Sequence, residues 1–225
     1  ADYPDLKFSV VAVSATNNNI ALLQFAEHEG SFLTGAIAAQ KSETGTIGFI
    51  GGVENDLIKK FEAGYVAGAK AVNPDINIEV KYIAADGDFS GFGNAAAAET
   101  IADGLYDGGA DVIYHASGDS GEGLFKSAVK AEKWAIGVDS NQYLTATPDQ
   151  QKYILSSMLK RVDVAVYGVI DSWTKGEFEA GSQVFDLSND GVGYATDGDY
   201  IDDTAAIDAL KQQVIDGEIE VPSAP

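Results

Sequence analysis

Apolar residues along this chain fall into two kinds of block that alternate from one end to the other. Short, almost unbroken apolar runs predict strands covered on both faces, and longer stretches with apolar residues three and four positions apart predict helices. The runs that predict strands are Lys7 to Ala15, 46–51, 78–84, 111–115 and 134–138. The stretches that predict helices are 30–40, 56–72, 94–106, 124–130 and 203–215.

The carboxyl-terminal third is predicted to contain a long helix and two further strands. A single long helix is expected over 151–173, because apolar residues recur on one stripe that includes Val162 and Val166. Lys160 lies off that stripe, so it is expected to face a cleft while the two valines face the core. Two further predicted strands are 182–187 and 191–195. Ser188-Asn189-Asp190 between them is a turn sequence typical of a hairpin.

The alternation of strands and helices decides the expected fold class. Such an order predicts parallel sheets joined by right-handed crossovers, so the class is α/β. Ligands of open parallel sheets bind beyond the carboxyl ends of the strands. The segments that follow the predicted strands are 14–16, 51–53, 86–94, 116–121 and 139–141. Candidate binding residues are therefore sought in these segments.

The composition narrows the class of protein without changing this fold. The 225 residues, of which 45% are hydrophobic, suffice for one large domain or two small lobes. The formal net charge of -21 would repel phosphate and argues against nucleic acid as a partner. The chain contains no cysteine, so a disulfide or a thiolate metal site is impossible. No apolar run approaches the length of a membrane span.

One motif resembles a catalytic site but lacks its partners. Gly118-Asp119-Ser120-Gly121 is similar to the segment around the nucleophile of trypsin-like proteases. The general base would have to be His28 or His115, the only histidines, and the expected α/β fold does not fit. His28 is interpreted as a surface or helix-entry residue, and His115 as either a rim residue or a satisfied core histidine. We therefore predict no catalytic residue.

Two glycine-rich motifs are equally incomplete. Residues 86–91 open like a calcium loop, but Ala97 stands at the twelfth position, where a bidentate glutamate is needed. Residues 91–96 have the letters of a dinucleotide-binding turn, yet they lie too far after their strand and beside acidic residues. We therefore predict no metal site and no cofactor.

Aromatic residues at post-strand positions share a predicted rim with one carboxylate. Phe89, Phe92 and Tyr114 are expected at the same edge as Asp139. An aromatic face stacks on bases or sugar rings, and a carboxylate accepts hydrogen bonds from paired hydroxyls such as those of ribose. Together these residues favour a polar and aromatic ligand pocket. Taken singly, each aromatic residue could instead only fill the edge of the sheet.

Several stretches, in order along nearly the whole chain, carry a resemblance to one family. They are 27–36 (EHEGSFLTGA), 48–52 (GFIGG), 61–69 (FEAGYVAGA), 135–140 (AIGVDS) and 157–163 (SMLKRVD). On these stretches the chain resembles the basic-membrane-protein family of nucleoside-binding lipoproteins, which are PnrA-like substrate-binding proteins of ABC transporters. The resemblance implies a type I periplasmic-binding-protein fold, with two doubly wound parallel-sheet lobes joined by hinge crossings.

The same resemblance implies a set of ligand-binding residues. Asp139 would hold the ribose hydroxyls, and Lys160, reaching in from the long helix, would hydrogen-bond the sugar or its ring oxygen. Phe89 would lie against the ligand after its strand. Tyr114 and Gly118 would form the turn beneath the base.

The resemblance is incomplete at the amino-terminal end. Members of the family begin with further βα units that carry an Asp and a Phe-Asn pair, and nothing here matches them. Many members also have an acidic residue where this chain has Ala12. We expect that the chain begins inside a longer protein, that its first lobe is incomplete, and that the strand near 10–13 has an unpaired edge. The membrane would be reached only through an N-terminal lipid anchor that this sequence does not include.

The resulting hypothesis is a two-lobed binding protein and not an enzyme. Residues 1–43 and 143–182 are expected to form a partial amino-terminal lobe, and residues 44–142 and 183–225 the carboxy-terminal lobe. The family implies an extracytoplasmic receptor, periplasmic or on the cell surface, that delivers a purine nucleoside to an ABC transporter permease. A receptor for a pentose or another small sugar, and a cytosolic ligand-sensing regulator, share the fold and stay open as alternatives.

Overall fold

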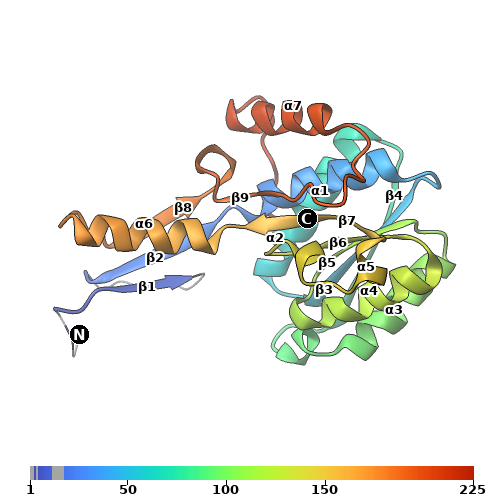
Figure 1. Ribbon diagram of the computed structural model, residues 1–225, viewed down its shortest axis with the longest axis horizontal. Coiled ribbons are helices and arrows are strands. Elements are labelled where there is room, and N and C mark those ends of the chain that lie inside the picture. The colour runs from blue at the N-terminus through green and yellow to red at the C-terminus, as the bar shows by residue number, and fades with distance from the viewer. Residues whose placement is uncertain (1–2, 4, 12–17) are drawn as a thin grey trace.

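The computed structural model describes residues 3, 5–11 and 18–225, which form two α/β units around two sheets (Figure 1). The smaller sheet has the strand order β1-β2-β8, and the larger has the order β4-β3-β5-β6-β7-β9. The strands are β1 (Phe8–Val11), β2 (Ile20–Phe25), β3 (Thr46–Val53), β4 (Asn77–Ala84), β5 (Val112–Ala116), β6 (Trp134–Gly137), β7 (Ile154–Lys160), β8 (Gly181–Phe185) and β9 (Val192–Tyr194). The helices are α1 (Glu27–Lys41), α2 (Asp56–Val72), α3 (Ala95–Asp107), α4 (Gly121–Ala131), α5 (Pro148–Gln151), α6 (Val162–Thr174) and α7 (Thr204–Ile215).

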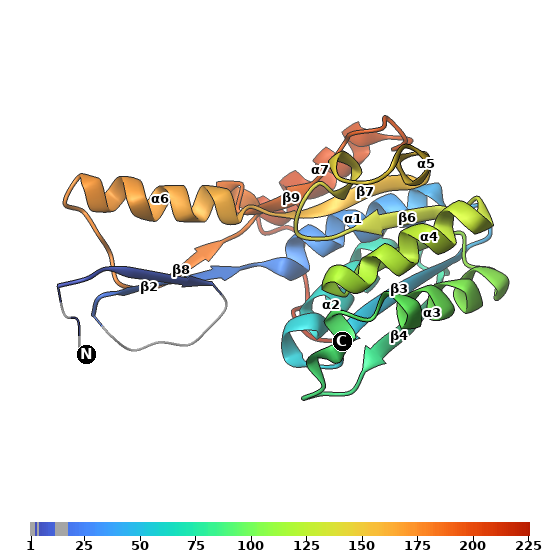
Figure 2. The same cartoon turned by 60° about the horizontal axis from the view of Figure 1, so that its bottom comes forward.

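The six-stranded sheet has a separate core on each face. Its strands are parallel except β9, which is antiparallel to β7. Successive strand residues point to opposite faces, so Tyr114 joins the core beneath α1 and α2 while Ile113 joins the core beneath α3 and α4. Figure 2 shows α3 and α4 together on one side of this sheet. Strands β3, β5 and β6 are buried on both faces, as their unbroken apolar runs predict.

Helices α1 and α2 pack unusually closely because glycines of one helix face the backbone of the other. A Cβ added at Gly35 of α1 would lie 2.0 Å from the carbonyl oxygen of Tyr65. A Cβ added at Gly64 of α2 would lie 2.0 Å from the carbonyl oxygen of His28. No side chain fits at such distances, so the small residues of these predicted helices have a packing role.

The three-stranded sheet lies beside the larger unit, and α6 runs along it (Figures 1 and 2). Its strand pairs are parallel. The chain passes between the two sheets at three places, which are the connections from β2 to α1, from β7 into α6 and from β8 to β9. Two parallel-sheet units linked by crossings agree with the expected fold class.

The predicted long helix over 151–173 is wrong in its first half. Residues Ile154–Lys160 form β7, which pairs with β6 on one side and with β9 on the other. Ile154 joins one core and Leu155 joins the other, so this segment is a strand buried on both faces whose apolar residues also fit a helical stripe. Only the second half is helical, as α6, and Val162 at its start is exposed instead of facing the core.

Two further expectations about strands are corrected. The segments 182–187 and 191–195 do not form a hairpin, because β8 pairs with β2 and β9 pairs with β7 in the other sheet. The short 3-10 helix Leu187–Asn189 carries the chain between them. Strand Ile20–Phe25 was not predicted, since only Ala26 separates it from α1 and no Gly or Pro marks the boundary.

The boundaries of the two units also differ from the expected division. Helix α1 and strand β7, both expected in the amino-terminal lobe, belong to the six-stranded unit, where α1 packs on α2 and β7 is a strand of the sheet. Of the predicted strand Lys7 to Ala15, Phe8–Val11 is described as β1. Ala12 and the segment 14–16 lie outside the described residues. Among the helices of the described residues, none is long and apolar enough to cross a membrane.

Candidate functional site

Three charged residues meet where the chain crosses from the six-stranded unit to the smaller sheet. Asp139 follows β6, Lys160 ends β7 and Glu27 begins α1. Lys160 Nζ lies 3.2 Å from Glu27 Oε1, and the side chains of this pair are only 10% and 2% exposed. The backbone N–H of Lys160 donates to the carbonyl oxygen of Asp139 at 2.9 Å. Lys160 Nζ also lies 5.4 Å from the ring centre of Phe25, within the range of a cation–π contact.

The backbone at Asp139 has an uncommon conformation. Its φ of 63° lies in the left-handed region, which is strained for a residue with a side chain. The Ser140 N–H donates to the carbonyl oxygen of Val138 at 2.7 Å, which closes a three-residue turn around Asp139. Strain of this kind persists only where the surrounding structure enforces it, and it is concentrated at ligand-binding sites. The backbone therefore singles out Asp139 on this rim.

The charges around Asp139 act on its carboxyl in opposite directions. Desolvation by the surrounding protein raises the pKa of Asp139, the Lys160 ammonium lowers it, and the Glu27 carboxylate raises it. The pKa of Asp139 is raised overall because desolvation is the largest of these effects.

Glu27 balances the charge of Lys160 from the first turn of α1, where the helix dipole stabilises a negative charge. Its second oxygen, Oε2, is buried, accepts no hydrogen bond from the described residues and lies 3.8 Å from Lys60 Nζ. Lys160 is thus already paired within the protein, and the rim offers no excess of positive charge.

A cleft of about 600 Å³ opens beside Asp139, where the segments that follow β5 and β6 lie next to each other. Asp139 and Gly118 both line it. Gly118 has a φ of 56°, so the tight turn after β5 suits a glycine. Asp119 and Glu122 also line the cleft and make its wall acidic. The structure thus brings together two of the predicted site residues.

Phe89 projects from the same edge of the sheet with a free ring. It opens the 3-10 helix Phe89–Phe92 after β4 and is 68% exposed. Its ring centre lies 6.4 Å from that of Phe92, which covers Gly52 near the end of β3. Phe89 is therefore available to stack on a ligand, although other residues line the cleft beside Asp139.

The expectation that Tyr114 stands on this rim is corrected. Tyr114 is fully buried in the middle of β5, where its ring packs against Phe49 and Tyr65. Its hydroxyl lies 3.1 Å from Ser31 Oγ, so the polar end is satisfied inside the protein. Burial raises the pKa of this phenol well above its ordinary value. The ring supports the sheet from beneath and offers no surface to a ligand.

Sequence reasoning placed Lys160 near the rim but on the wrong element, and it missed Glu27. Lys160 reaches the rim as the last residue of a strand and not from a helix. Glu27 was not predicted as a site residue because β2, the strand before it, was not predicted. The available signal was the segment Phe25-Ala26-Glu27, in which an apolar run ends in an acidic residue directly before a glycine-rich helix.

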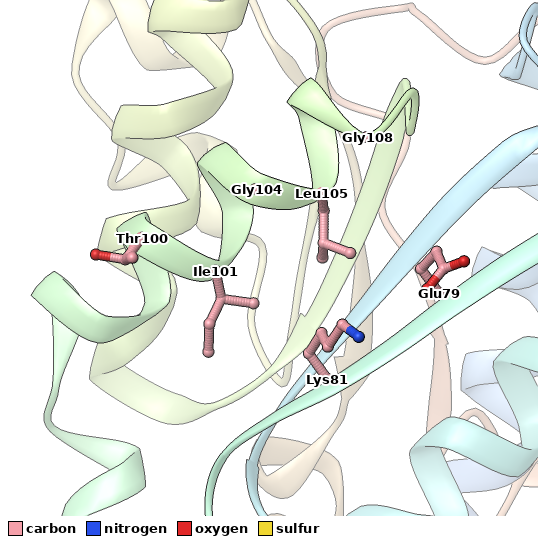
Figure 3. A pocket seen from close by; sticks show the side chains of 7 residues that line it. All are labelled: Glu79, Lys81, Thr100, Ile101, Gly104, Leu105 and Gly108. Carbon is pink, nitrogen blue, oxygen red and sulfur yellow. The ribbon is translucent and has the colours of Figure 1, made fainter.

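A second hollow lies away from this rim, between β4 and α3 (Figure 3). Its volume is about 530 Å³. Ile101 and Leu105 point from α3 toward the strand that carries Glu79 and Lys81. None of the predicted binding residues lines it. In the part of the chain that the structure describes, no group of three or more acidic or histidine side chains is arranged to hold a metal ion.

Solved structures share this architecture. A solute-binding protein of an ABC transporter system from Conexibacter woesei superposes with a TM-score of 0.78 at 24% identity, covering 99% of this chain and 73% of that one. A protein from Bacillus halodurans described as a transcriptional activator of the comK gene gives a TM-score of 0.80 at 23% identity, covering 98% and 74%. At this identity the likeness defines the fold, which is that of the periplasmic-binding-protein class.

Sequence comparison assigns the chain to one family within this fold class. The family model for PnrA-like substrate-binding proteins of ABC transporters, the Bmp family, matches residues 1–224, and the chain belongs to this family. The ABC transporter nucleoside-binding protein BmpA of Lactococcus lactis is 35% identical over 98% of this chain. Basic membrane protein A of Borreliella burgdorferi is 34% identical, also over 98%. The chain spans 65% of the length of each of these relatives. The family inferred from the sequence is thereby confirmed.

Proposed function

We propose that this chain is the ligand-binding part of an extracytoplasmic solute receptor of an ABC importer, and that it binds a purine nucleoside at the carboxyl ends of β5, β6 and β7. The proposal is carried by the strained Asp139, held beside Lys160 at the rim of a cleft. A relative at 35% identity is named as a nucleoside-binding protein, which supports the same class of ligand.

Each side chain of the rim would recognise a different part of a nucleoside. Asp139 would accept hydrogen bonds from the ribose hydroxyls, and Lys160 would donate to a sugar oxygen. Phe89 would stack on the base, and Gly118 would let the backbone approach the ligand closely. A free base would use mainly Phe89, and a pentose mainly Asp139 and Lys160. A nucleoside uses more of the site than either.

The charges of the site favour an uncharged ligand over a phosphorylated one. Lys160 is neutralised by Glu27 at 3.2 Å, and Asp119 and Glu122 line the cleft. A phosphate would therefore enter a region of negative potential. A nucleoside presents hydroxyls and ring nitrogens instead, which carboxylates and an ammonium group bind without a net charge on the ligand.

The proposed activity is capture and release, with no bond made or broken. The receptor would pass its ligand to an ABC transporter permease. It would be periplasmic or displayed on the cell surface, attached through an N-terminal lipid anchor. These properties of the whole protein are inferred from the family.

A competition series tests the ligand class. Binding of inosine, guanosine, adenosine, hypoxanthine, ribose and a nucleoside monophosphate is compared by calorimetry, with analysis of products after long incubation. We expect the nucleosides to bind more tightly than hypoxanthine, ribose or the monophosphate. Ribose binding as tightly as inosine would favour a sugar receptor. Protein-dependent release of free base would show that the protein is an enzyme.

A further inference from the structure

A buried histidine lies beneath the two turns that line the cleft. His115 in β5 is fully buried, with Nδ1 at 3.2 Å from Ser117 Oγ and Nε2 at 2.9 Å from Gln142 Oε1. The same Gln142 oxygen accepts a hydrogen bond of 2.7 Å from the backbone N–H of Val138. The backbone N–H of Gln142 donates to Ser157 Oγ at 3.2 Å. This network joins the segment that follows β5 to the segment that follows β6.

One group in this network, the backbone N–H of Val138, can only donate, and it fixes the direction of the other hydrogen bonds. The Val138 N–H can only donate, so the Gln142 atom that receives it is the amide oxygen, which can only accept. His115 must then carry its hydrogen on Nε2, and Nδ1 must accept from the Ser117 hydroxyl. Burial lowers the pKa of His115 to about 4, so the ring is neutral near pH 7. Both ring nitrogens are satisfied in this tautomer.

The network restrains the residue directly before Asp139. Val138 opens the strained turn, and its N–H is held by Gln142. The carbonyl oxygen of Asp139 is held from the other side by the N–H of Lys160 at 2.9 Å. A left-handed aspartate needs restraint of this kind, because it otherwise relaxes to an ordinary conformation. The histidine ring itself is fixed by close packing, since a Cβ added at Gly121 would lie 2.0 Å from His115 Cε1.

We propose that His115 and Gln142 are positioning residues for ligand binding, which hold the turn 138–140 so that the Asp139 carboxylate faces the ligand. His115 acts through Gln142, and Gln142 acts through the backbone of Val138. This inference rests on the proposed role of Asp139 in binding. Gln142 and Val138 line the cleft beside Asp139, and His115 is buried behind them.

A pair of glutamine variants separates positioning from stability. Gln142→Met removes the shared acceptor and leaves the Val138 N–H and His115 Nε2–H unpaired, so inosine affinity should fall roughly tenfold. Gln150→Met is the matched control, because the Gln150 side chain also hydrogen-bonds two other residues, Thr147 and Glu122, but does not line the cleft. The control should lose thermal stability with inosine affinity kept. Gln142→Met binding inosine like the wild type would overturn the proposal.

Two further measurements keep the proposal testable if Gln142→Met folds poorly. Gln142→Glu retains an oxygen acceptor and should keep inosine affinity within about threefold of the wild type, whereas loss like that of Gln142→Met would contradict a positioning role. Nitrogen NMR of the wild type should show His115 protonated on Nε2 near neutral pH. Protonation on Nδ1 would overturn the hydrogen-bond assignment and the proposal with it.

A double-mutant cycle distinguishes failure of this inference from failure of the proposed function. If Gln142 acts through the Asp139 carboxylate, Gln142→Met should weaken inosine binding no further in an Asp139→Asn background. Additive losses would show that Gln142 acts independently and would overturn the positioning role alone. No effect of Asp139→Asn on inosine binding would instead overturn the proposed function of the rim.

Discussion

Asp139 has a left-handed backbone, which asparagine and glycine adopt at lower cost than other residues. Its place after β6 was predicted from the rule that ligands bind beyond strand ends, and that rule needs only the order of elements. Tyr114 was misplaced because it lies within β5 and not after it. The direction in which a strand residue points depends on the register, and both faces of β5 are apolar. Periodicity therefore could not show which face the ring occupies.

Substitutions at Asp139 separate its charge from its backbone. Asp139→Asn keeps the size and tolerates the left-handed conformation but removes the charge, so inosine affinity should fall about tenfold or more. Asp139→Ala should lose similar affinity and also stability, because alanine tolerates this φ poorly. Asp139→Gly should unfold at a higher temperature than Asp139→Ala. Calorimetry and thermal unfolding measure both effects. Full inosine affinity in Asp139→Asn and Asp139→Gly would remove this residue from the site.

His115 should make stability depend on pH in a defined window. Burial lowers the folded pKa to about 4, whereas the unfolded chain has the ordinary value of 6.5. Between these values the unfolded state binds a proton that the folded state does not. The free energy of unfolding should therefore fall as the pH falls from 6.5 to about 4, by up to roughly 3 kcal/mol from this residue. Above pH 6.5 and below pH 4, His115 does not make the free energy of unfolding depend on pH.

Denaturant unfolding across that pH range, in the wild type and in His115→Gln, checks the size of this contribution. The variant has no group that titrates at this position, so its stability should depend less on pH. Equal pH dependence in the two proteins would mean that other groups cause the acid destabilisation. The other histidine, His28, has a lowered pKa for the same main reason and is unchanged in both proteins.

At the scale of elements, periodicity succeeded where a segment satisfied only one pattern. Helix Asp56–Val72 was predicted with its observed bounds because its apolar residues follow a helical stripe. In the structure, Asn55 caps this helix by accepting a hydrogen bond from the Ile58 N–H. The apolar residues of Ile154–Lys160 fit both a helical stripe and a buried strand, and the segment forms a strand because it pairs with β6 and β9. That decision depends on partners distant in the sequence, which a local window does not contain.

The close packing of α1 and α2 predicts opposite effects for two helical glycines. Gly64→Ala would place a Cβ 2.0 Å from His28 O, forcing the helices apart, and should destabilise the protein by roughly 2–4 kcal/mol. Gly168→Ala in α6 meets no atom within 4 Å and should stabilise that helix by about 0.5–1 kcal/mol. Denaturant unfolding of both variants compares them. Equal stability of the two would contradict the helix contact described here.

At the scale of the whole molecule, the sequence predicted parallel sheets but not which strands belong to each sheet. Strand β2 pairs with β8, and Leu22 faces Ser182 across this pair although most of the six-stranded unit separates them in the chain. No local pattern carries such a pairing. The family resemblance implied two lobes, but α1, which was expected in the amino-terminal lobe, packs on α2 of the six-stranded unit.

The smaller unit carries an exposed apolar surface, which we call the α6 face and define by Tyr167, Ile170 and Trp173. These side chains are 72%, 52% and 57% exposed. They lie on the helix that runs along the three-stranded sheet (Figure 2), whose outer strands β1 and β8 each have a free edge within the described residues. Clustered apolar side chains and free strand edges both favour association.

We therefore expect a protein of these 225 residues to self-associate reversibly through the α6 face, more strongly as its concentration rises. The double variant Ile170→Lys/Trp173→Glu puts charges on this face, away from the proposed ligand rim, and should shift the protein toward the monomer. Leu144→Glu is the matched control, because Leu144 is a single exposed apolar residue (66%) on another element and should leave association unchanged. Sedimentation velocity over a range of micromolar concentrations measures all three proteins. A wild type that stays monomeric at every concentration would mean that the α6 face does not cause association. A double variant that associates like the wild type would place the contact at the free strand edges.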